Sequence, residues 1–260
     1  AMLKGLYTAW SGMVNEQNRM DVMTNNLANA TTTGYKKEGT TSQSFDTVLA
    51  YRINDLSTGM NVSTRIGANS PGVKIGENYV DHSQGSFKST GNTFDLAIGG
   101  EGFFNVEFTS KSGETSVKYT RDGNFTLNVD GYLVTQDGDY VLDENNQHIK
   151  LNTALDATIA EDGSIWQDGS VVTKIKLTDF EDYDYLVRYG ENYFEAIEGA
   201  TPIDTQATIN SGYLEQSNIS VVTEMVNMIT ISRAYETNQK VVQTYDRVLD
   251  TTVNQIGRLG

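Results

Sequence analysis

Few side chains in this sequence could support redox, metal or nucleophilic chemistry. Its 260 residues include no cysteine, which excludes disulfides, thiolate metal sites and a thiol nucleophile. The two histidines, His82 and His148, leave little material for an imidazole metal site. His82 follows Asp81, but the sequence contains no G-x-S-x-G motif that would supply a serine nucleophile.

The 34 acidic residues do not form a recognisable site either. The acidic run from Asp137 to Asn145 lacks the sixth-position glycine and the closing glutamate of a calcium-binding EF-hand loop. The GGEG stretch at 99–102 lacks the glycine spacing and the following helix of a phosphate-binding loop. No acidic pair sits in the apolar context that raises a catalytic carboxyl pKa. We therefore expect a protein that is not an enzyme and that has no catalytic residue, metal or cofactor.

The charge balance indicates which partners to exclude. The chain carries a formal net charge of -15, which argues against nucleic-acid binding and against an anionic membrane surface. Residues 1–35 have two acidic and two basic side chains, and residues 215–260 have five and four. Residues 36–214 therefore hold fourteen of the net negative charges, so the ends and the middle are expected to meet different surroundings.

Targeting and membrane signals are weak. No stretch approaches the roughly 20 apolar residues that span a bilayer. Thr8, Ser11 and Asn15 interrupt any apolar segment of a secretory signal. On these rules alone the sequence predicts a cytosolic protein without membrane insertion. Ala1 before Met2 has the look of a tag remnant, and we leave it out of the fold prediction.

The N-terminal part predicts a helix over residues 2–35. Positions with alternating spacings of three and four form a heptad seam: Leu3, Leu6, Trp10, Met13, Gln17, Met20, Thr24 and Leu27. The segment closes on a threonine run and Gly34, a residue that tolerates the left-handed conformation common at helix ends.

The C-terminal part predicts a second, longer helix within residues 215–260. Apolar residues recur every seven positions, with a second seam beside them: Val221, Met228, Ile231, Tyr235, Val242, Tyr245, Leu249, Ile256 and Leu259. The polar seam residues Gln17, Thr24, Asn238 and Thr252 either fix the register of helix pairing or simply face solvent.

Between the helices the sequence predicts strands and tight turns. Asp-Gly occurs five times between residues 122 and 169, flanked by short alternating runs. Because Asp-Gly favours the type I′ turn that matches strand twist, we expect a hairpin-rich antiparallel β domain over 80–214. Residues 36–79 have weak periodicity and predict an extended connector. The predicted fold class is α+β, mainly β, with terminal heptad helices that pair as a coiled coil.

Two features allow alternative interpretations. Tyr183, Tyr185, Tyr189 and Tyr193 could form a carbohydrate- or base-stacking platform, although cross-strand packing is the commoner use of such residues. The helices could pair only with each other, but their apolar residues spread beyond one seam, which favours burial against several neighbours.

Specific strings resemble a known family. At the N-terminal side these are NNLAN at 25–29 and TGYK at 33–36. At the C-terminal side they are GYLEQSN at 212–218, EMVNMI at 224–229 and RAYE at 233–236. Internal strings are TGN at 90–92, DLAI at 95–98, GFF at 102–104 and YTRDG at 119–123. Together they resemble the bacterial flagellar basal-body rod and hook axial proteins, most closely the distal rod type, over nearly the whole chain.

That resemblance implies a structural subunit that polymerises helically through its terminal helices and serves motility as part of a drive shaft. It implies an inner assembly domain made of helices 2–35 and 215–260, and an outer β domain at 80–214. It also implies localisation to the flagellar basal body, with export through the flagellar apparatus without a cleaved signal, which replaces the cytosolic prediction. The implied partners are further copies of the chain, other rod and hook subunits and the export apparatus.

From seams and resemblance together we predict an assembly interface at Leu3, Leu6, Trp10, Met13, Met20, Leu27, Val221, Met228, Ile231, Tyr235, Val242, Tyr245, Leu249 and Ile256. The signature turn predicted by the resemblance is Asn25, Asn26, Ala28, Asn29, Gly34 and Tyr35. We expect the ends to be largely disordered in a free subunit and to fold on assembly. The alternatives are a secreted or surface carbohydrate-binding β module and an acid-catalysed hydrolase of peptidoglycan.

Overall fold

The computed structural model describes residues 2–46, 48–52, 64–70, 72–110, 113–205 and 207–256. The chain divides into two compact units. The first, called the helical unit below, comprises Ala1–Leu27, Glu38–Val80 and Val221–Gly260. The second, called the β unit, comprises Ala28–Lys37 and Asp81–Ser220.

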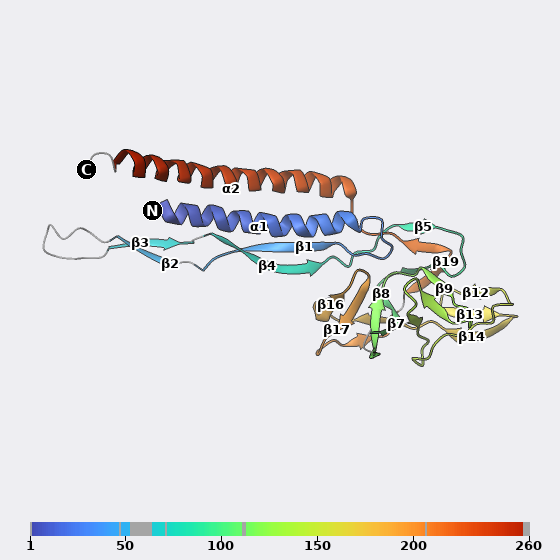
Figure 1. The fold of residues 1–260 in the computed structure, drawn as a ribbon. Coiled ribbons are helices and arrows are strands. Elements are labelled where there is room, and N and C mark those ends of the chain that lie inside the picture. The colour runs from blue at the N-terminus through green and yellow to red at the C-terminus, as the bar shows by residue number, and fades with distance from the viewer. Residues whose placement is uncertain are drawn as a thin grey trace. The chain divides into compact units, whose positions relative to one another are not determined.

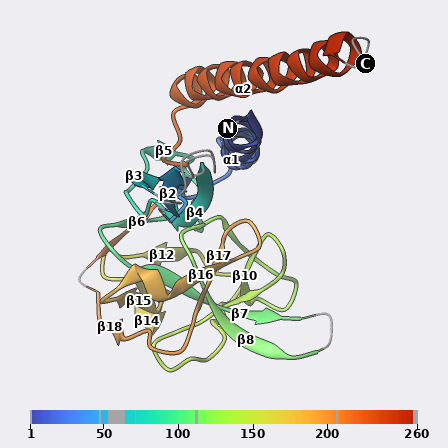
Figure 2. The same ribbon diagram turned by 90° about the vertical axis from the view of Figure 1, so that its left-hand side faces the viewer.

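Two long helices dominate the helical unit. Helix α1 spans Met2–Ala28 and helix α2 spans Val221–Ile256, and they run antiparallel side by side (Figures 1 and 2). Both are shorter than the predicted ranges. Helix α1 stops before the run of β-branched threonines at 31–33, and α2 begins at Val221, six residues after the predicted start; residues 257–260 lie outside the described residues. No glycine or proline lies between residues 221 and 256, which is consistent with an uninterrupted helix of that length.

The segment predicted as an extended connector contains two antiparallel strand pairs. Strand β1 (Glu38–Ser44) pairs with β4 (Val73–Val80), and β2 (Val48–Arg52) pairs with β3 (Thr64–Asn69). Two-stranded ribbons are marginal in water unless another element supports them. Here α1 supplies that support, because the Ser42 hydroxyl donates to Asn15 Oδ1 at 3.0 Å.

The β unit is antiparallel throughout its described pairings. Nine strands form its main sheet, in the order β16-β17-β8-β7-β11-β10-β9, with β15 paired to β7 and β18 paired to β15. Three strands form a smaller sheet in the order β12-β13-β14, and the pairs β19-β6 and β20-β5 complete the unit. The bounds are β5 (Phe87–Ser89), β6 (Leu96–Gly99), β7 (Phe103–Thr109), β8 (Thr115–Thr120), β9 (Phe125–Leu127), β10 (Leu133–Thr135), β11 (Tyr140–Val141), β12 (Ala157–Ile159), β13 (Ser164–Gln167), β14 (Ser170–Lys174), β15 (Leu177–Phe180), the 3-10 helix η2 (Tyr183–Tyr185), β16 (Leu186–Tyr189), β17 (Tyr193–Ala196), β18 (Pro202–Ile203), β19 (Thr208–Ser211) and β20 (Tyr213–Glu215).

A single apolar cluster fills the interior of the β unit. It is built from residues of many short strands and of the segments that connect them: Leu96, Ile98, Phe104, Val106, Phe125, Leu133, Val141, Ile149, Leu151, Ile165, Ile175 and Ile209. Alternate residues of a strand point to opposite faces, so each short strand contributes only one or two of these side chains. The α+β, mainly β prediction therefore holds, and the two helices pack against each other.

The Asp-Gly turns differ in type. At Asp168-Gly169 both residues have positive φ, 50° and 74°, and Gln167 pairs with Ser170 across the turn. This is the type I′ hairpin that the sequence predicts. At the Asp-Gly pairs ending in Gly131, Gly138 and Gly163 only the glycine has positive φ, and at Gly123 neither residue does. The predicted turn type is wrong at those four positions, although hairpins do dominate the unit.

Candidate functional site

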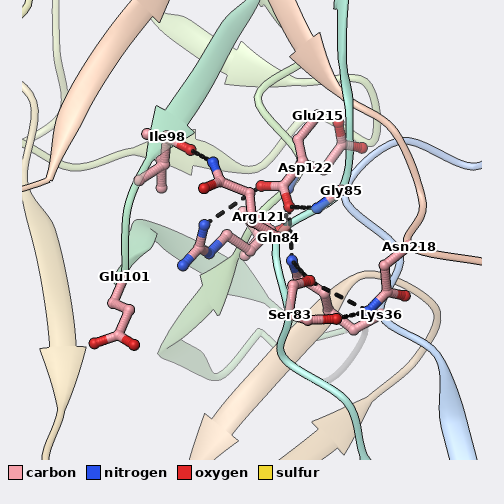
Figure 3. Close-up of polar contacts among 12 residues, drawn as sticks. Lys36, Ser83, Gln84, Gly85, Ile98, Glu101, Arg121, Asp122, Glu215 and Asn218 are labelled. Atoms are coloured by element: carbon pink, nitrogen blue, oxygen red, sulfur yellow. Dashed lines mark hydrogen bonds and ion pairs between the residues drawn. The ribbon is translucent and has the colours of Figure 1, made fainter.

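Three charged side chains from distant parts of the sequence meet inside the β unit (Figure 3). Glu215 Oε1 lies 2.6 Å from Lys36 Nζ, and Glu215 Oε2 lies 3.4 Å from Arg121 Nη1. The three side chains are buried, with exposed fractions of 1% for Lys36, 3% for Arg121 and 0% for Glu215. Each comes from a string that carries the family resemblance. We call these three residues the charge cluster.

The charge cluster is well supplied with hydrogen bonds. Glu215 Oε1 also accepts from the backbone N–H of Gly85 at 2.9 Å, and Lys36 Nζ also donates to the carbonyl of Ser83 at 2.9 Å. Removing an ion from water costs several kcal/mol, which is offset only by close pairing and further hydrogen bonds. Because this geometry is met by one arrangement of the three segments, the charge cluster specifies how they come together.

Backbone and amide contacts extend the same junction. The Gly34 N–H donates to the Glu215 carbonyl at 2.8 Å, and the Lys37 N–H donates to Asn218 Oδ1 at 2.8 Å. The Asn218 side-chain amide in turn donates to the carbonyl of Asp81 at 2.8 Å. The segment after α1 and the segment before α2 are thus bonded side by side within the β unit.

Gly34 is required at this junction for two reasons. Its φ of 66° lies in the left-handed region that a side chain disfavours. A Cβ at this position would also lie 2.5 Å from the Arg121 carbonyl carbon, so a side chain would displace the backbone there. The neighbouring Thr33 hydroxyl donates to Asp122 Oδ1 at 2.7 Å, which holds the same approach.

A half-buried histidine, His82, lies beside the charge cluster. Burial lowers the pKa of His82 to about 4, and the positive charges of Lys36 and Arg121 act in the same direction. The imidazole packs among aromatic rings, with its centroid 4.7 Å from that of Tyr183 and 5.2 Å from that of Phe194. Burial also lowers the pKa of Lys36, an effect that Glu215 opposes.

Tyrosines of the group considered as a possible stacking platform make internal contacts. The Tyr183 hydroxyl donates to Asp179 Oδ1 at 2.7 Å, and the Tyr193 hydroxyl donates to Asp139 Oδ2 at 2.8 Å. Lys118 Nζ lies 4.3 Å from the Tyr189 ring centroid. This is the packing use of the tyrosines. Among the described residues, no group of three or more His, Asp or Glu gathers as metal ligands would.

In the helical unit, glycines of α1 face large side chains of α2. A side chain at Gly5 would overlap the Tyr245 ring, and a Cβ at Gly12 would lie 2.9 Å from Asn238 Nδ2. Seven residues separate the two contacts on each helix, in opposite directions along the chain. The helices therefore pack closely in an antiparallel arrangement, and coiled-coil geometry stays a prediction.

The predicted interface residues differ in exposure. Ile231 is buried, with 2% of its surface exposed, whereas Trp10, Val221 and Leu249 are exposed at 54%, 39% and 41%. The side chains of Leu3 and Ile256 lie outside the described residues. Intermediate burial applies to Leu6, Met13, Met20, Leu27, Met228, Tyr235, Val242 and Tyr245.

A second face of α1 was missed by the sequence prediction. Small and polar residues are buried there instead of the heptad seam: Ser11, Asn15, Val22 and Asn26. The Asn26 side chain bonds both backbone groups of Glu38 in β1: its amide donates to the Glu38 carbonyl at 2.7 Å, and its Oδ1 accepts from the Glu38 N–H at 2.9 Å. The 4-7-4 spacing of positions 11, 15, 22 and 26 places them on one face of a helix, and this spacing in the sequence could have indicated the second buried face.

The residues of the predicted signature turn occupy different surroundings. Asn25, Asn26 and Ala28 lie in the last turn of α1, and Asn29 lies in the turn that follows. Gly34 and Tyr35 are buried in the β unit; Arg188 stacks on Tyr35 at 4.1 Å from the ring centroid.

Comparison with known families places these features in context. Residues 6–36 match the flagella basal body rod protein family, and residues 210–256 match the flagellar basal body rod FlgEFG protein C-terminal family. Residues 97–172 match the D1 domain family of the flagellar hook protein FlgE/F/G.

Curated relatives match over nearly their whole length. The flagellar basal-body rod protein FlgG of Bacillus subtilis (strain 168) is 34% identical, with 97% of this chain and 99% of the relative covered. The flagellar basal-body rod protein FlgF of Caulobacter vibrioides (strain ATCC 19089 / CIP 103742 / CB 15) is 32% identical, with 99% of this chain and 100% of the relative covered. The chain belongs to the flagellar basal-body rod protein family.

Family membership confirms the resemblance drawn from the strings. The FlgG protein of Buchnera aphidicola subsp. Schizaphis graminum (strain Sg) is a further relative, 30% identical over 95% of this chain and 98% of its own length. Lys36 lies in the N-terminal family match and Glu215 lies in the C-terminal one. The charge cluster therefore joins the two terminal signatures of a rod-family protein.

Replacing Glu215 tests the energetic role of the charge cluster. Glu215→Gln leaves two buried cations without their counter-charge, so we expect a loss of about 3–5 kcal/mol in the free energy of unfolding by urea. The matched control is Glu144→Gln, which breaks an exposed 2.7 Å pair with Lys174 and is expected to cost under about 1 kcal/mol. Equal losses in the two variants would contradict the assignment.

The half-buried His82 predicts a specific pH dependence. Because its pKa is about 4 in the folded state and 6.5 in the reference state, the unfolded chain binds more protons between these values. This contribution to stability is complete above pH 6.5 and is lost as the pH falls toward 4, by up to about 3 kcal/mol. Urea unfolding of the wild type and of His82→Phe across pH 4–7 measures it. Curves that stay parallel would rule it out.

Proposed function

We propose that this protein is a structural subunit of the bacterial flagellar basal-body rod, which polymerises helically through its terminal helices and transmits rotation as part of the drive shaft for motility. The observation that carries the proposal is the end-to-end similarity to proteins named flagellar basal-body rod proteins. The FlgG relatives favour the distal part of the rod. No observation favours the carbohydrate-binding alternative.

The exposed apolar surface of α2 supports assembly through the helices. Val222 and Val226 have exposed fractions of 72% and 58% on a helix whose other side already packs on α1. An apolar groove of about 510 Å³ also lies along α2, lined by Thr237, Lys240, Val241, Thr244, Tyr245 and Val248. Concentrated exposed apolar surface of this kind marks an interaction site.

We further propose that folding of the helices is coupled to assembly. A pair of helices with much of its apolar surface in water gains little free energy to offset the entropy of ordering. The β unit has its own apolar cluster and the charge cluster, and it does not need a neighbour for stability. Contacts with neighbouring copies would bury the apolar faces of the helices, and a head-to-tail contact that does not close produces an open helical filament.

Partners and location follow from the same proposal. The partners are further copies of this chain, other rod and hook subunits and the flagellar export apparatus. The location is the flagellar basal body. Neither described helix combines the length and apolar character needed to cross a bilayer. The role is mechanical rather than enzymatic, with no cofactor.

Charge introduced on the inner face of α2 should stop assembly. Ile231→Asp or Met228→Asp places a carboxylate in the helix packing face, so we expect loss of filaments in electron micrographs of concentrated protein. Gln239→Asp adds the same charge at an exposed position of α2 and should still polymerise. Far-ultraviolet circular dichroism should retain the β signal in every variant. Normal filaments from Ile231→Asp would refute the role of this face.

Coupled folding predicts uneven hydrogen exchange in a dilute monomer. Amides of α2 should exchange far faster than those of β7 and β8, because only the latter belong to an independently stable core. On polymerisation the α2 amides should become protected. Full protection of α2 in the dilute monomer would show that the helices fold without neighbours.

A further inference from the structure

An exposed stripe of large apolar residues lies on α1. Tyr7, Trp10 and Val14 have exposed fractions of 46%, 54% and 38%. Each is two residues, or about 200° around the helix, from Gly5 or Gly12, the glycines that face α2. The stripe is therefore on the side of α1 opposite α2. We call it the α1 stripe.

A matching patch lies on the outer side of α2. It consists of four residues at helical spacing with exposed fractions between 50% and 72%: Val222, Met225, Val226 and Ile229. Val222 and Val226 are each two residues from the buried Glu224, and Ile229 is two residues from the buried Ile231. By the same rotation the patch is opposite the side that packs on α1. We call it the α2 patch.

The two surfaces have equal lengths and a fixed offset. Each spans eight residues, 7–14 on α1 and 222–229 on α2. Within one chain Gly5 faces Tyr245 and Gly12 faces Asn238, so Trp10 is level with position 240. Val226 lies fourteen residues from that position, which is about 21 Å along the helix axis. The same fourteen-residue offset separates Tyr7 from Ile229 and Val14 from Val222.

We propose that the α1 stripe of one copy docks on the α2 patch of a second copy, antiparallel and staggered by two heptads, with Tyr7 beside Ile229, Trp10 beside Val226 and Val14 beside Val222. This rests on the proposed rod function and specifies which surfaces assemble. Fourteen residues are two whole heptads. The α1–α2 contact between two copies would therefore have nearly the same rotational phase along the helices as the α1–α2 contact within one chain. Each helix would then lie between two helices of the other kind.

A second copy accounts for both surfaces better than symmetric pairing does. A two-fold contact between two α2 patches closes on itself and leaves both α1 stripes in water. The staggered contact buries both surfaces and leaves one of each kind free for the next copy. Its area is small beside the roughly 800 Å² per partner of a stable pair, so it would be weak singly and would persist when repeated in a polymer.

Cysteine cross-linking of the full-length chain tests the proposal against a cysteine-free background. Val14→Cys with Val222→Cys should give a ladder of dimers, trimers and larger covalent species under mild oxidation. Within one chain the two sulfurs are about 21 Å apart along the axis, too far for a disulfide, which needs Cα atoms within about 7 Å. Each single variant alone should stay monomeric, and a mixture of the two should give mixed dimers.

The controls separate this contact from polymerisation itself. Val14→Cys with Val129→Cys places the second thiol on a fully exposed residue of the β unit and should give no ladder. Covalent dimers from a single variant would overturn the heterologous contact in favour of a symmetric one. Filaments in electron micrographs without a ladder would overturn the staggered docking while leaving the rod function intact. No filaments and no ladder would overturn both.

Discussion

The buried carboxylate of Glu215 is the interaction on which the organisation of the β unit depends. It pairs with two buried cations, Lys36 from the N-terminal part of the chain and Arg121 from the middle. A buried ion pair offsets the cost of removing its charges from water only when the two partners are in contact, so it favours the one arrangement in which they meet. Because α1 ends before Lys36 and α2 begins after Glu215, this pairing fixes the adjacent points at which both helices connect to the β unit.

The helical unit is held together by close helix packing and side-chain hydrogen bonds rather than by buried ion pairs such as those of the charge cluster. Within it, glycines of α1 pack closely against Tyr245 and Asn238 of α2. Asn15 and Asn26 of α1 hydrogen-bond to residues of strand β1. The outer faces of the helical unit expose aliphatic and aromatic side chains to water. A β unit with its own apolar cluster, joined to a helical unit with exposed apolar surface, is consistent with the proposed coupling of helix folding to assembly.

Sequence reasoning identified the parts whose signals are local. Heptad spacing located both helices, Asp168-Gly169 located a type I′ hairpin, and the terminal strings located the family. The charge cluster was not predictable, because a lone Lys36 or Glu215 in the sequence has the composition of a surface charge and its partner lies 179 positions away. The β1–β4 ribbon was hidden because β1, EGTTSQS, has no apolar residue, and the alternation of β4 stops after Val73-Lys74-Ile75.

The register of the helices affects both the α1–α2 contact within a chain and the proposed contact between chains. Of the polar seam residues, Asn238 packs against Gly12, whereas Gln17 is exposed and Thr24 and Thr252 are exposed with hydroxyls bonded to their own helices. Asn238 is therefore the polar seam residue placed to set the register within a chain, by filling space that a glycine leaves open. In the proposed docking, a neighbour displaced by whole heptads presents its outer face in the same rotational phase, so one helical period would serve both the folded subunit and the contact between subunits.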